Sequence, residues 1–269
     1  MVEKKINMNK YQCNEDAVIS FSGGRSSGFL LHKVIQAYDG TLPDHIKVIF
    51  CNTGKEMPQT LDFVEDCSQK WNVPIVWLEY RSKRNFSVVN YDTASKNGEP
   101  FEMMIDDKKM LPSPPKRFCT SELKVLTIER YMKSLGINQW TTFVGIRADE
   151  PTRVAKMKMK EDYLVPFSKD KILKKDIIDF WNNNNFDLNL PAHGDFSNCD
   201  LCFLKRLSLK KTIIKEDSER AIWWMDQEQK VNHFFRADHP SYRQMYENAE
   251  KQQDFFGADD ETIACFCGD

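Results

Sequence analysis

The 269-residue sequence contains no apolar run that approaches the roughly 18 to 20 residues a helix needs to cross a bilayer. The lysines near its N-terminus are followed by polar residues, not by a continuous hydrophobic segment, so no signal peptide is expected. The 38 basic and 40 acidic side chains nearly cancel, which leaves no overall field that would attract nucleic acid. Together these absences predict a cytoplasmic protein with no membrane partner.

The composition is that of an ordinary globular protein. Hydrophobic residues make up 41% of the chain and charged residues 29%, so there is enough apolar surface for a core and no signature of disorder. At roughly 100 to 200 residues per domain, the length allows one large domain or a core with an appended subdomain. The sequence has no internal repeat and gives no indication of an oligomeric state.

Short β-rich runs alternate with helical patterns in the first 150 residues. Such alternation predicts βαβ units around a parallel sheet of five or six strands, with ligands at the carboxyl ends of the strands. Strands are expected over 17–22, 46–51, 73–80 and 141–146, and helices over 26–38, 58–71 and 121–135, the last capped by Gly136.

Two other segments differ in pattern from this α/β region. Residues 81–118 are polar and contain several prolines, which predicts an irregular loop or lid. From about residue 160 onward the pattern changes to helices and loops. We therefore predict a nucleotide-binding α/β domain over residues 1–160 and a helical, cysteine-bearing subdomain over residues 161–269.

The first predicted strand runs into a glycine turn, Ser20 to Ser27, that precedes a helix. Unhindered backbone N–H groups and a helix N-terminus can surround an anion there, so phosphate is the natural ligand. The spacing is neither that of a Rossmann fingerprint nor that of a Walker A loop. A plain turn with a serine N-cap is the alternative.

The cysteines form a second candidate site. Cys199 and Cys202 make a C-x-x-C, Cys119 lies 80 residues upstream of Cys199, and Cys265 and Cys267 close the chain. Such a set suits redox chemistry, zinc or an iron–sulfur cluster. The other three cysteines, Cys13, Cys51 and Cys67, are expected to be packing residues.

Basic residues form two further groups of interest. Arg117, Lys124, Arg147 and Arg153 can bind sulfate or phosphate, although exposed charges of this kind are often only solvated. A basic run near the C-x-x-C is expected to be a solvated helix face, yet nucleic acid would require such a surface: Lys205, Arg206, Lys210, Lys211 and Lys215.

Several of these motifs resemble one known superfamily. Ser22-Gly23-Gly24-Arg25-Ser26-Ser27 looks like the pyrophosphate-binding loop of the N-type ATP pyrophosphatases and PAPS reductases. Segments 50–56, 117–124 and 145–153 are similar to its adenosine-reading strand end, its R-x-C-T-x-x-L-K segment and its later nucleotide-side motif. The motifs follow the family order between about residues 15 and 230.

The resemblance implies a fold and a nucleotide site. The fold would be a twisted parallel sheet of the adenine nucleotide alpha hydrolase type, followed by the helical subdomain. The implied nucleotide-binding residues are Ser20, Ser22, Gly23, Gly24, Arg25, Ser26, Ser27, Asn52, Thr53, Gly54, Arg117, Lys124, Gly145, Arg147 and Arg153.

The resemblance also implies a cofactor. Cluster-bearing APS reductases have cysteines upstream of a C-x-x-C, so Cys119, Cys199, Cys202 and Cys267 are the expected ligands of a 4Fe-4S cluster, with zinc as the alternative. Cys265 would be the nucleophile that attacks sulfonucleotide sulfur, and Arg147 is a second catalytic candidate. This chain has one upstream cysteine where those reductases have two, and its tail lacks their Glu and His.

The leading functional hypothesis is a PAPS reductase-like enzyme that binds APS, PAPS or ATP, with thioredoxin or glutaredoxin as partner. Ser26 replaces the aspartate that ATP-cleaving members carry, which favours a reductase. ATP-dependent thiolation of tRNA or DNA is the alternative, and nucleic acid is a partner only in that case. A non-catalytic protein that senses nucleotide or cluster is a third hypothesis.

Overall fold

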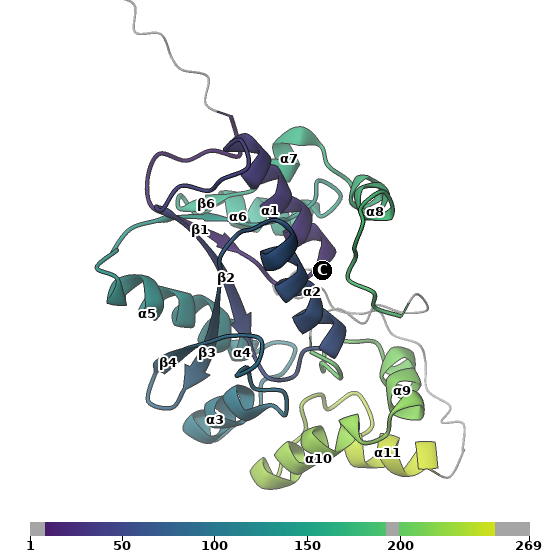
Figure 1. Ribbon diagram of the computed structural model, residues 1–269. Coiled ribbons are helices and arrows are strands. Elements are labelled where there is room, and N and C mark those ends of the chain that lie inside the picture. Colours follow the sequence, from purple (N-terminus) through teal and green to yellow (C-terminus); the bar gives the residue numbers. More distant parts are fainter. Residues whose placement is uncertain (1–8, 192–198, 251–269) are drawn as a thin grey trace, which may run out of the picture.

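The computed structural model describes residues 9–191 and 199–250, and its centre is a six-stranded sheet (Figure 1). The strand order is β4-β3-β2-β1-β5-β6, and all neighbours are parallel except β3 and β4. The predicted α/β class is confirmed, with the correction that one edge strand is antiparallel. The strands are β1 (Ala17–Ser20), β2 (Ile46–Asn52), β3 (Ile75–Arg81), β4 (Asn85–Val89), β5 (Thr141–Phe143) and β6 (Tyr163–Leu164).

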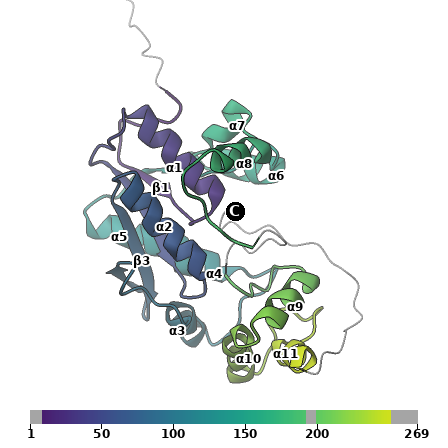
Figure 2. The same cartoon turned by 45° about the vertical axis from the view of Figure 1, so that its right-hand side comes forward.

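Alternate residues of the central strands enter two different cores. On β1, Ala17 and Ile19 face the core under α1 (Arg25–Ala37) and α2 (Pro58–Lys70), whereas Val18 faces α5 (Leu126–Ser134). Successive side chains of a strand point to opposite faces of the sheet, so each face is covered by its own helical layer. Figures 1 and 2 show α1 and α2 together on one face and α5 on the other. The ends of β1, β2 and β5 lie between these layers.

The segment between β3 and α5 is more regular than its prolines suggest. The prediction of an irregular stretch over residues 81–118 was wrong, because the segment contains β4 and the helix α3 (Glu99–Lys108). Pro100 lies in the first turn of α3, where proline is tolerated, and Gly98 precedes the helix with a φ of 91°. The remaining prolines follow α3. Proline and glycine therefore flank this helix instead of breaking it.

Helical structure also begins earlier than expected before α5. The chain is helical from α4 (Phe118–Thr120) through a π-helical turn, Ser121–Val125, into α5. The predicted cap at Gly136 is confirmed, since its φ is 81° and its N–H donates to the Lys133 carbonyl at 3.0 Å. Turns of π type are rare and occur often at functional sites.

Beyond residue 150 the chain first stays with the sheet. Helix α6 (Pro151–Lys158) precedes β6, and α7 (Pro166–Asp170) and α8 (Lys174–Asn182) pack into the core under α1 through Phe167 and Trp181. The change in packing thus comes after α8 and not at residue 160. The division into two domains itself stays a prediction.

The last described helices form a second core. Helices α9 (Leu207–Glu216), α10 (Arg220–Val231) and α11 (Tyr242–Glu250) lie together beside α3 in both ribbon views. Phe101 of α3, Trp224 of α10 and Tyr242 of α11 share this apolar cluster. None of the helices in the described ranges is both long and apolar enough to cross a membrane.

Candidate functional site

The loop after β1 turns sharply between the sheet and α1. Gly23 has a φ of +77°, and a β-carbon at this position would lie 2.7 Å from the Thr60 side chain. The Ser27 hydroxyl closes the loop, because it accepts hydrogen bonds from the backbone N–H groups of Ser22 and Gly24 at 3.2 Å each. The loop is therefore held in shape before any ligand binds.

The start of α1 is also fixed from the far side. Arg25 pairs with Asp187 through two hydrogen bonds of 2.8 and 2.5 Å, and its carbonyl accepts a hydrogen bond from the Trp181 indole at 2.9 Å. A β-carbon on Gly28 would come within 2.7 Å of the same indole. Arg25 thus anchors the helix to the segment around α8, and its nucleotide-binding role stays a prediction.

A cavity of about 970 Å³ opens beside this loop. It lies at the carboxyl ends of the parallel strands, which is where doubly wound sheets bind ligands. Its lining includes seven of the predicted nucleotide-binding residues: Ser20, Ser22, Ser27, Arg117, Lys124, Gly145 and Arg153. The structure therefore brings the β1 loop, the helical segment after residue 117 and the loop after β5 around one space.

Positive charge dominates the wall of this cavity. Besides the predicted cations, Lys133, Lys156 and Lys160 line it, against the acidic side chains of Glu129 and Asp162. Sequence reasoning missed Lys156 and Lys160, although their spacing from Arg153, three and seven residues, places all three on one side of the α6 segment. Such a wall suits a ligand with several negative charges.

The other predicted residues of the described chain lie outside the cavity lining. Among them, Arg147 pairs with Asp149 at 2.9 Å and with Glu150 at 3.7 Å. Its catalytic role stays a prediction. The remaining ones are Gly23, Gly24, Arg25, Ser26, Asn52, Thr53 and Gly54.

Asn52 and Thr53 are buried and bind other protein groups. The Asn52 amide donates to Glu79 at 2.6 Å and to the Ser95 carbonyl at 2.8 Å, and its oxygen accepts from the Gly54 N–H at 3.0 Å. These contacts shape the turn after β2. They assign Asn52 a structural role, and adenosine recognition at this turn stays a prediction.

Glu56, in the same turn, is buried and interacts electrostatically with Lys124, which lines the cavity. Burial raises the pKa of its carboxyl, while the Lys124 ammonium and two hydrogen bonds from Thr53 act against the rise. The Thr53 hydroxyl also lies 3.5 Å from the Cys199 sulfur. Lys124 is thus electrostatically linked to the same short segment that touches the C-x-x-C.

Three of the predicted metal ligands occur in the described chain. Cys119, Cys199 and Cys202 belong to the same apolar cluster, but no group of three or more His, Cys, Asp or Glu side chains within residues 9–191 and 199–250 is arranged to hold a metal. Cys265 and Cys267 lie outside the described residues. The described residues alone do not fit a cluster or a zinc ion, so the cofactor stays a prediction.

The remaining cysteines behave as packing residues. Cys13, Cys51 and Cys67 are buried. Burial raises the pKa of the Cys67 thiol well above its ordinary value, which makes a reactive thiolate unfavourable there. The prediction that these three cysteines are packing residues is confirmed by their burial.

The expectation that the basic run near the C-x-x-C is a solvated face was wrong for two of its five residues, whereas Arg206 and Lys215 are exposed and Lys211 is half-buried. Lys205 and Lys210 are buried, with 2% and 1% of their surface exposed. The Lys210 ammonium lies 2.6 Å from the His239 ring and above the Tyr242 ring. Sequence spacing could not reveal this, because the covering residues come from later in the chain.

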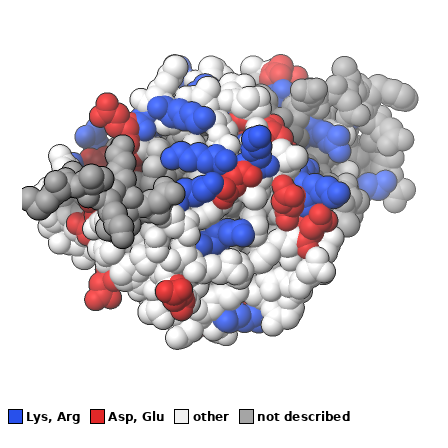
Figure 3. All heavy atoms as spheres, turned by 90° about the horizontal axis from the view of Figure 1, so that it is seen from above, with Lys and Arg blue, Asp and Glu red and all other residues white. Residues whose placement is uncertain are grey.

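Exposed lysines occur instead around α6 to α8. Seen from above Figure 1, the molecule presents a group of basic side chains with acidic ones interspersed (Figure 3). The exposed lysines of this region include Lys158, Lys169, Lys171, Lys174 and Lys175. The basic character of the protein is therefore local, in agreement with its small net charge.

The parallel sheet, the glycine loop at its edge and the cationic cavity define a nucleotide-binding α/β protein. The sequence model of the phosphoadenosine phosphosulfate reductase domain matches residues 16–163. The chain belongs to this family, which is a family of enzymes that bind adenine nucleotides. The match ends before the C-x-x-C.

Two curated proteins are similar to the chain. The uncharacterized nin region protein ORF290 of Escherichia phage lambda is 32% identical over 218 residues, which cover 75% of this chain and 70% of that protein. The uncharacterized protein MJ0973 of Methanocaldococcus jannaschii is 30% identical over 117 residues, which cover 42% of this chain and 22% of that protein.

Proposed function

We propose that the protein binds an adenosine sulfonucleotide, APS or PAPS, in the large cavity and transfers its sulfo group to a cysteine. The observation that carries this proposal is the preformed Ser22–Ser27 loop, which opens onto a cavity of about 970 Å³ with a cationic wall. The loop has Ser26 where ATP-cleaving relatives carry an aspartate, and Ser26 is buried. This difference supports a reaction that does not split ATP.

The reaction follows from the chemistry of the sulfo group. A cysteine thiolate, Cys265 in our prediction, attacks the sulfonyl sulfur; an S–S bond forms, and the S–O bond to the phosphate breaks. AMP or its 3′-phosphate leaves with the electron pair of that bond. An external dithiol, thioredoxin or glutaredoxin, then reduces the S–S bond, becomes a disulfide and releases sulfite.

The cavity residues have separate tasks in this proposal. The start of α1 and those N–H groups of the glycine loop that do not donate to Ser27 bind the phosphate next to the sulfo group. Arg117, Lys124 and Arg153 balance the charge of the nucleotide and stabilise the phosphate that leaves. The hydroxyls of Ser22 and Ser27 keep the loop in the shape that this requires.

Titration with APS, PAPS, ATP and AMP tests the binding step, and a sulfite assay with reduced thioredoxin tests the chemistry. Lys124→Met should weaken sulfonucleotide binding roughly tenfold, because about 1.4 kcal/mol is a reasonable value for one lost charge contact. Lys70→Met is the matched control, since Lys70 pairs with Asp66 on α2 and lies outside the cavity. Equal losses in both variants would contradict the proposal.

The cysteine step is tested separately. Cys265→Ser should abolish sulfite formation while sulfonucleotide binding is retained. Full activity in both Cys265→Ser and Cys267→Ser would exclude a nucleophile in the tail. Tight nucleotide binding with no sulfite and no pyrophosphate would instead identify a non-catalytic nucleotide sensor.

ATP-dependent thiolation of tRNA or DNA is the second candidate, and the exposed lysines around α6 to α8 favour it. It predicts release of pyrophosphate from ATP and nucleic acid binding that weakens steeply with salt. The burial of Lys205 and Lys210 reduces the support that the basic run near the C-x-x-C would have provided. Sulfite release from APS or PAPS without nucleic acid would decide against this candidate.

A further inference from the structure

The C-x-x-C turn is held by side chains from three separate elements. The Asp200 carboxylate accepts a hydrogen bond from the Trp224 indole of α10 at 2.9 Å. The Tyr242 hydroxyl of α11 donates to the Leu201 carbonyl at 2.6 Å. Lys55, from the turn after β2, pairs with Asp200 at 3.0 Å. Lys55 is thus the member of this group that belongs to the sheet side of the molecule.

The backbone around Lys55 also pairs with the C-x-x-C turn. The Asp200 N–H donates to the Lys55 carbonyl at 2.7 Å, and Glu56 and Cys199 form an isolated antiparallel bridge. As a result the Cys199 sulfur comes to lie 3.5 Å from the Thr53 hydroxyl. The position of Cys199 therefore depends on how closely residues 199–200 stay attached to residues 53–56.

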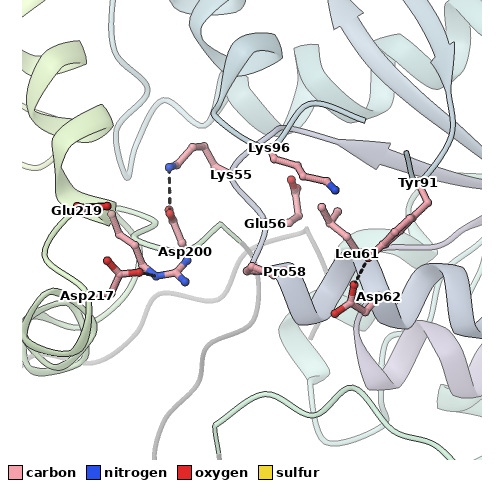
Figure 4. Close-up of a pocket in the computed structure, with 11 residues that line it drawn as sticks. Lys55, Glu56, Pro58, Leu61, Asp62, Tyr91, Lys96, Asp200, Asp217 and Glu219 are labelled. Atoms are coloured by element: carbon pink, nitrogen blue, oxygen red, sulfur yellow. Dashed lines mark hydrogen bonds and ion pairs between the residues drawn. The ribbon is translucent and has the colours of Figure 1, made fainter. Parts of the chain in front are cut away.

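The ion pair is almost fully shielded from water. The exposed fractions of the Lys55 and Asp200 side chains are 8% and 4%. Figure 4 shows the Lys55 ammonium directed at the Asp200 carboxylate on the wall of a second pocket of about 290 Å³. The Trp223 ring lies 5.3 Å from the same ammonium. A buried pair of this kind adds little net stability, but it defines geometry because neither charge tolerates the loss of the other.

We propose that Lys55 is a positioning residue for the C-x-x-C: through its ion pair with Asp200 it fixes the Cys199 thiol beside Thr53 at the end of β2. The proposal concerns the geometry of the thiol and is independent of the nucleotide chemistry proposed above.

Docking of the C-terminal helices alone is the competing explanation, and Lys230 provides the control for it. Lys230 on α10 pairs with Glu102 at 2.9 Å and Asp106 at 2.5 Å on α3. It therefore holds α10 against α3, beside the same apolar cluster that contains the C-x-x-C, through ion pairs that do not involve residues 199–202. A variant that only loosens docking should resemble Lys230→Met.

The experiment measures the alkylation rate of each cysteine by iodoacetamide in the purified protein as isolated, followed by peptide mass spectrometry. Lys55→Met alone leaves a buried carboxylate without its partner, so it is combined with Asp200→Asn to keep the site neutral. Asp200→Asn alone removes the ion pair from the other end and retains the acceptor for Trp224, but it leaves the buried Lys55 ammonium without its partner. Lys55→Arg preserves the charge. A more mobile turn exposes its thiol more often.

We expect Cys199 to react at least about tenfold faster in the double variant and in Asp200→Asn, with rates near wild type in Lys55→Arg and Lys230→Met. The buried Cys67 reports unfolding of the whole protein, so its rate should stay unchanged in every variant. The proposal is overturned if the Cys199 rate stays within about twofold of wild type in both the double variant and Asp200→Asn. It is equally overturned if Lys230→Met or Cys67 shows the same increase.

Discussion

Gly145 packs directly against the backbone of Ser26, so that a β-carbon added to Gly145 would lie 2.8 Å from the Ser26 carbonyl oxygen. This contact joins the loop after β5 to the loop after β1, two segments that are 119 residues apart in the sequence. Neither side can yield easily, because the obstructing atoms are backbone atoms. Close packing of these two loops therefore limits the width of the cavity beside the β1 loop.

Gly145→Ala should consequently separate the two loops and weaken nucleotide binding at least about tenfold. Overpacking of this kind also costs about 1–3 kcal/mol of stability. Calorimetric titration with the nucleotide and chemical denaturation measure the two effects. Gly136→Ala is the control, since its φ of +81° makes alanine unfavourable by about 1–2 kcal/mol but no atom lies within 4 Å of the added carbon. Its affinity should be that of wild type, and equal losses in both variants would contradict the prediction.

The π-helical turn before α5 gives a second prediction. The Thr127 hydroxyl is buried and donates to the Glu122 carbonyl at 2.8 Å, which satisfies a carbonyl at the irregular turn. Lys124, which lines the cavity, lies between these two residues. Thr127→Val should cost about 1 kcal/mol of stability and, because Lys124 shifts, roughly fivefold in nucleotide affinity.

Thr127→Ser keeps the hydroxyl and is the matched control for this change. It should retain the affinity of wild type even if it loses some packing. If Thr127→Val bound nucleotide as tightly as Thr127→Ser, the π-helical turn would have no part in placing Lys124.

The fold could be predicted from the sequence where its pattern is local. The short apolar, β-rich runs 17–22 and 46–51 identified β1 and β2, because each buried strand carries its own signal. The strand β4 and the helix α3 were missed, since Pro100 and its neighbours were interpreted as breaks although they stand at the start of a helix. Their regularity depends on the partner strand β3 and on the C-terminal core.

The site could be predicted in part for the same reason. Residues in or beside a recognisable motif, such as Ser27 and Arg153, do line the cavity. Asn52 also lies in such a motif, yet its side chain donates a hydrogen bond to Glu79 and does not line the cavity. Lys55 and Asp200 are 145 residues apart, and a single lysine in a sequence carries no information about a partner so distant. Such pairs are determined by tertiary packing.

The buried Glu56 gives a prediction for pH. Its pKa lies above the ordinary value of 4.5 in the folded protein because of burial, so the folded state binds more protons than the unfolded state in the window above 4.5. Its contribution to stability is fully present below that window and is lost as the pH rises through the folded pKa. The Tm of Glu56→Gln relative to wild type should therefore increase progressively as the pH rises above 4.5.

Asp107 provides a contrast of opposite sign. The Tyr80 hydroxyl donates to its carboxylate at 2.6 Å, and this hydrogen bond lowers the pKa of Asp107 below its ordinary value of 3.8. Its contribution to stability is present above 3.8 and is lost as the pH falls through the folded pKa. Asp107→Asn should lower the Tm at neutral pH and have less effect in acid. If the two variants shifted with pH in the same direction, the burial argument for Glu56 would be wrong.

The cysteine cluster gives the last prediction. Cys119, Cys199 and Cys202 share one apolar cluster, so a cofactor bound there needs ligands beyond the described residues, and Cys267 is the predicted fourth. Protein purified without oxygen should show a broad absorption band near 400 nm and about four irons per chain. Cys199→Ser should remove both, whereas Cys67→Ala, in the separate core under α1, should retain them.

A colourless protein with one zinc that is lost in Cys199→Ser would identify the zinc alternative, because the same thiolates suit either metal. Metal content that is equal in wild type and Cys199→Ser would exclude the C-x-x-C as a metal site. The position of Cys199 beside Thr53 would then have to be explained by a role of the free thiol.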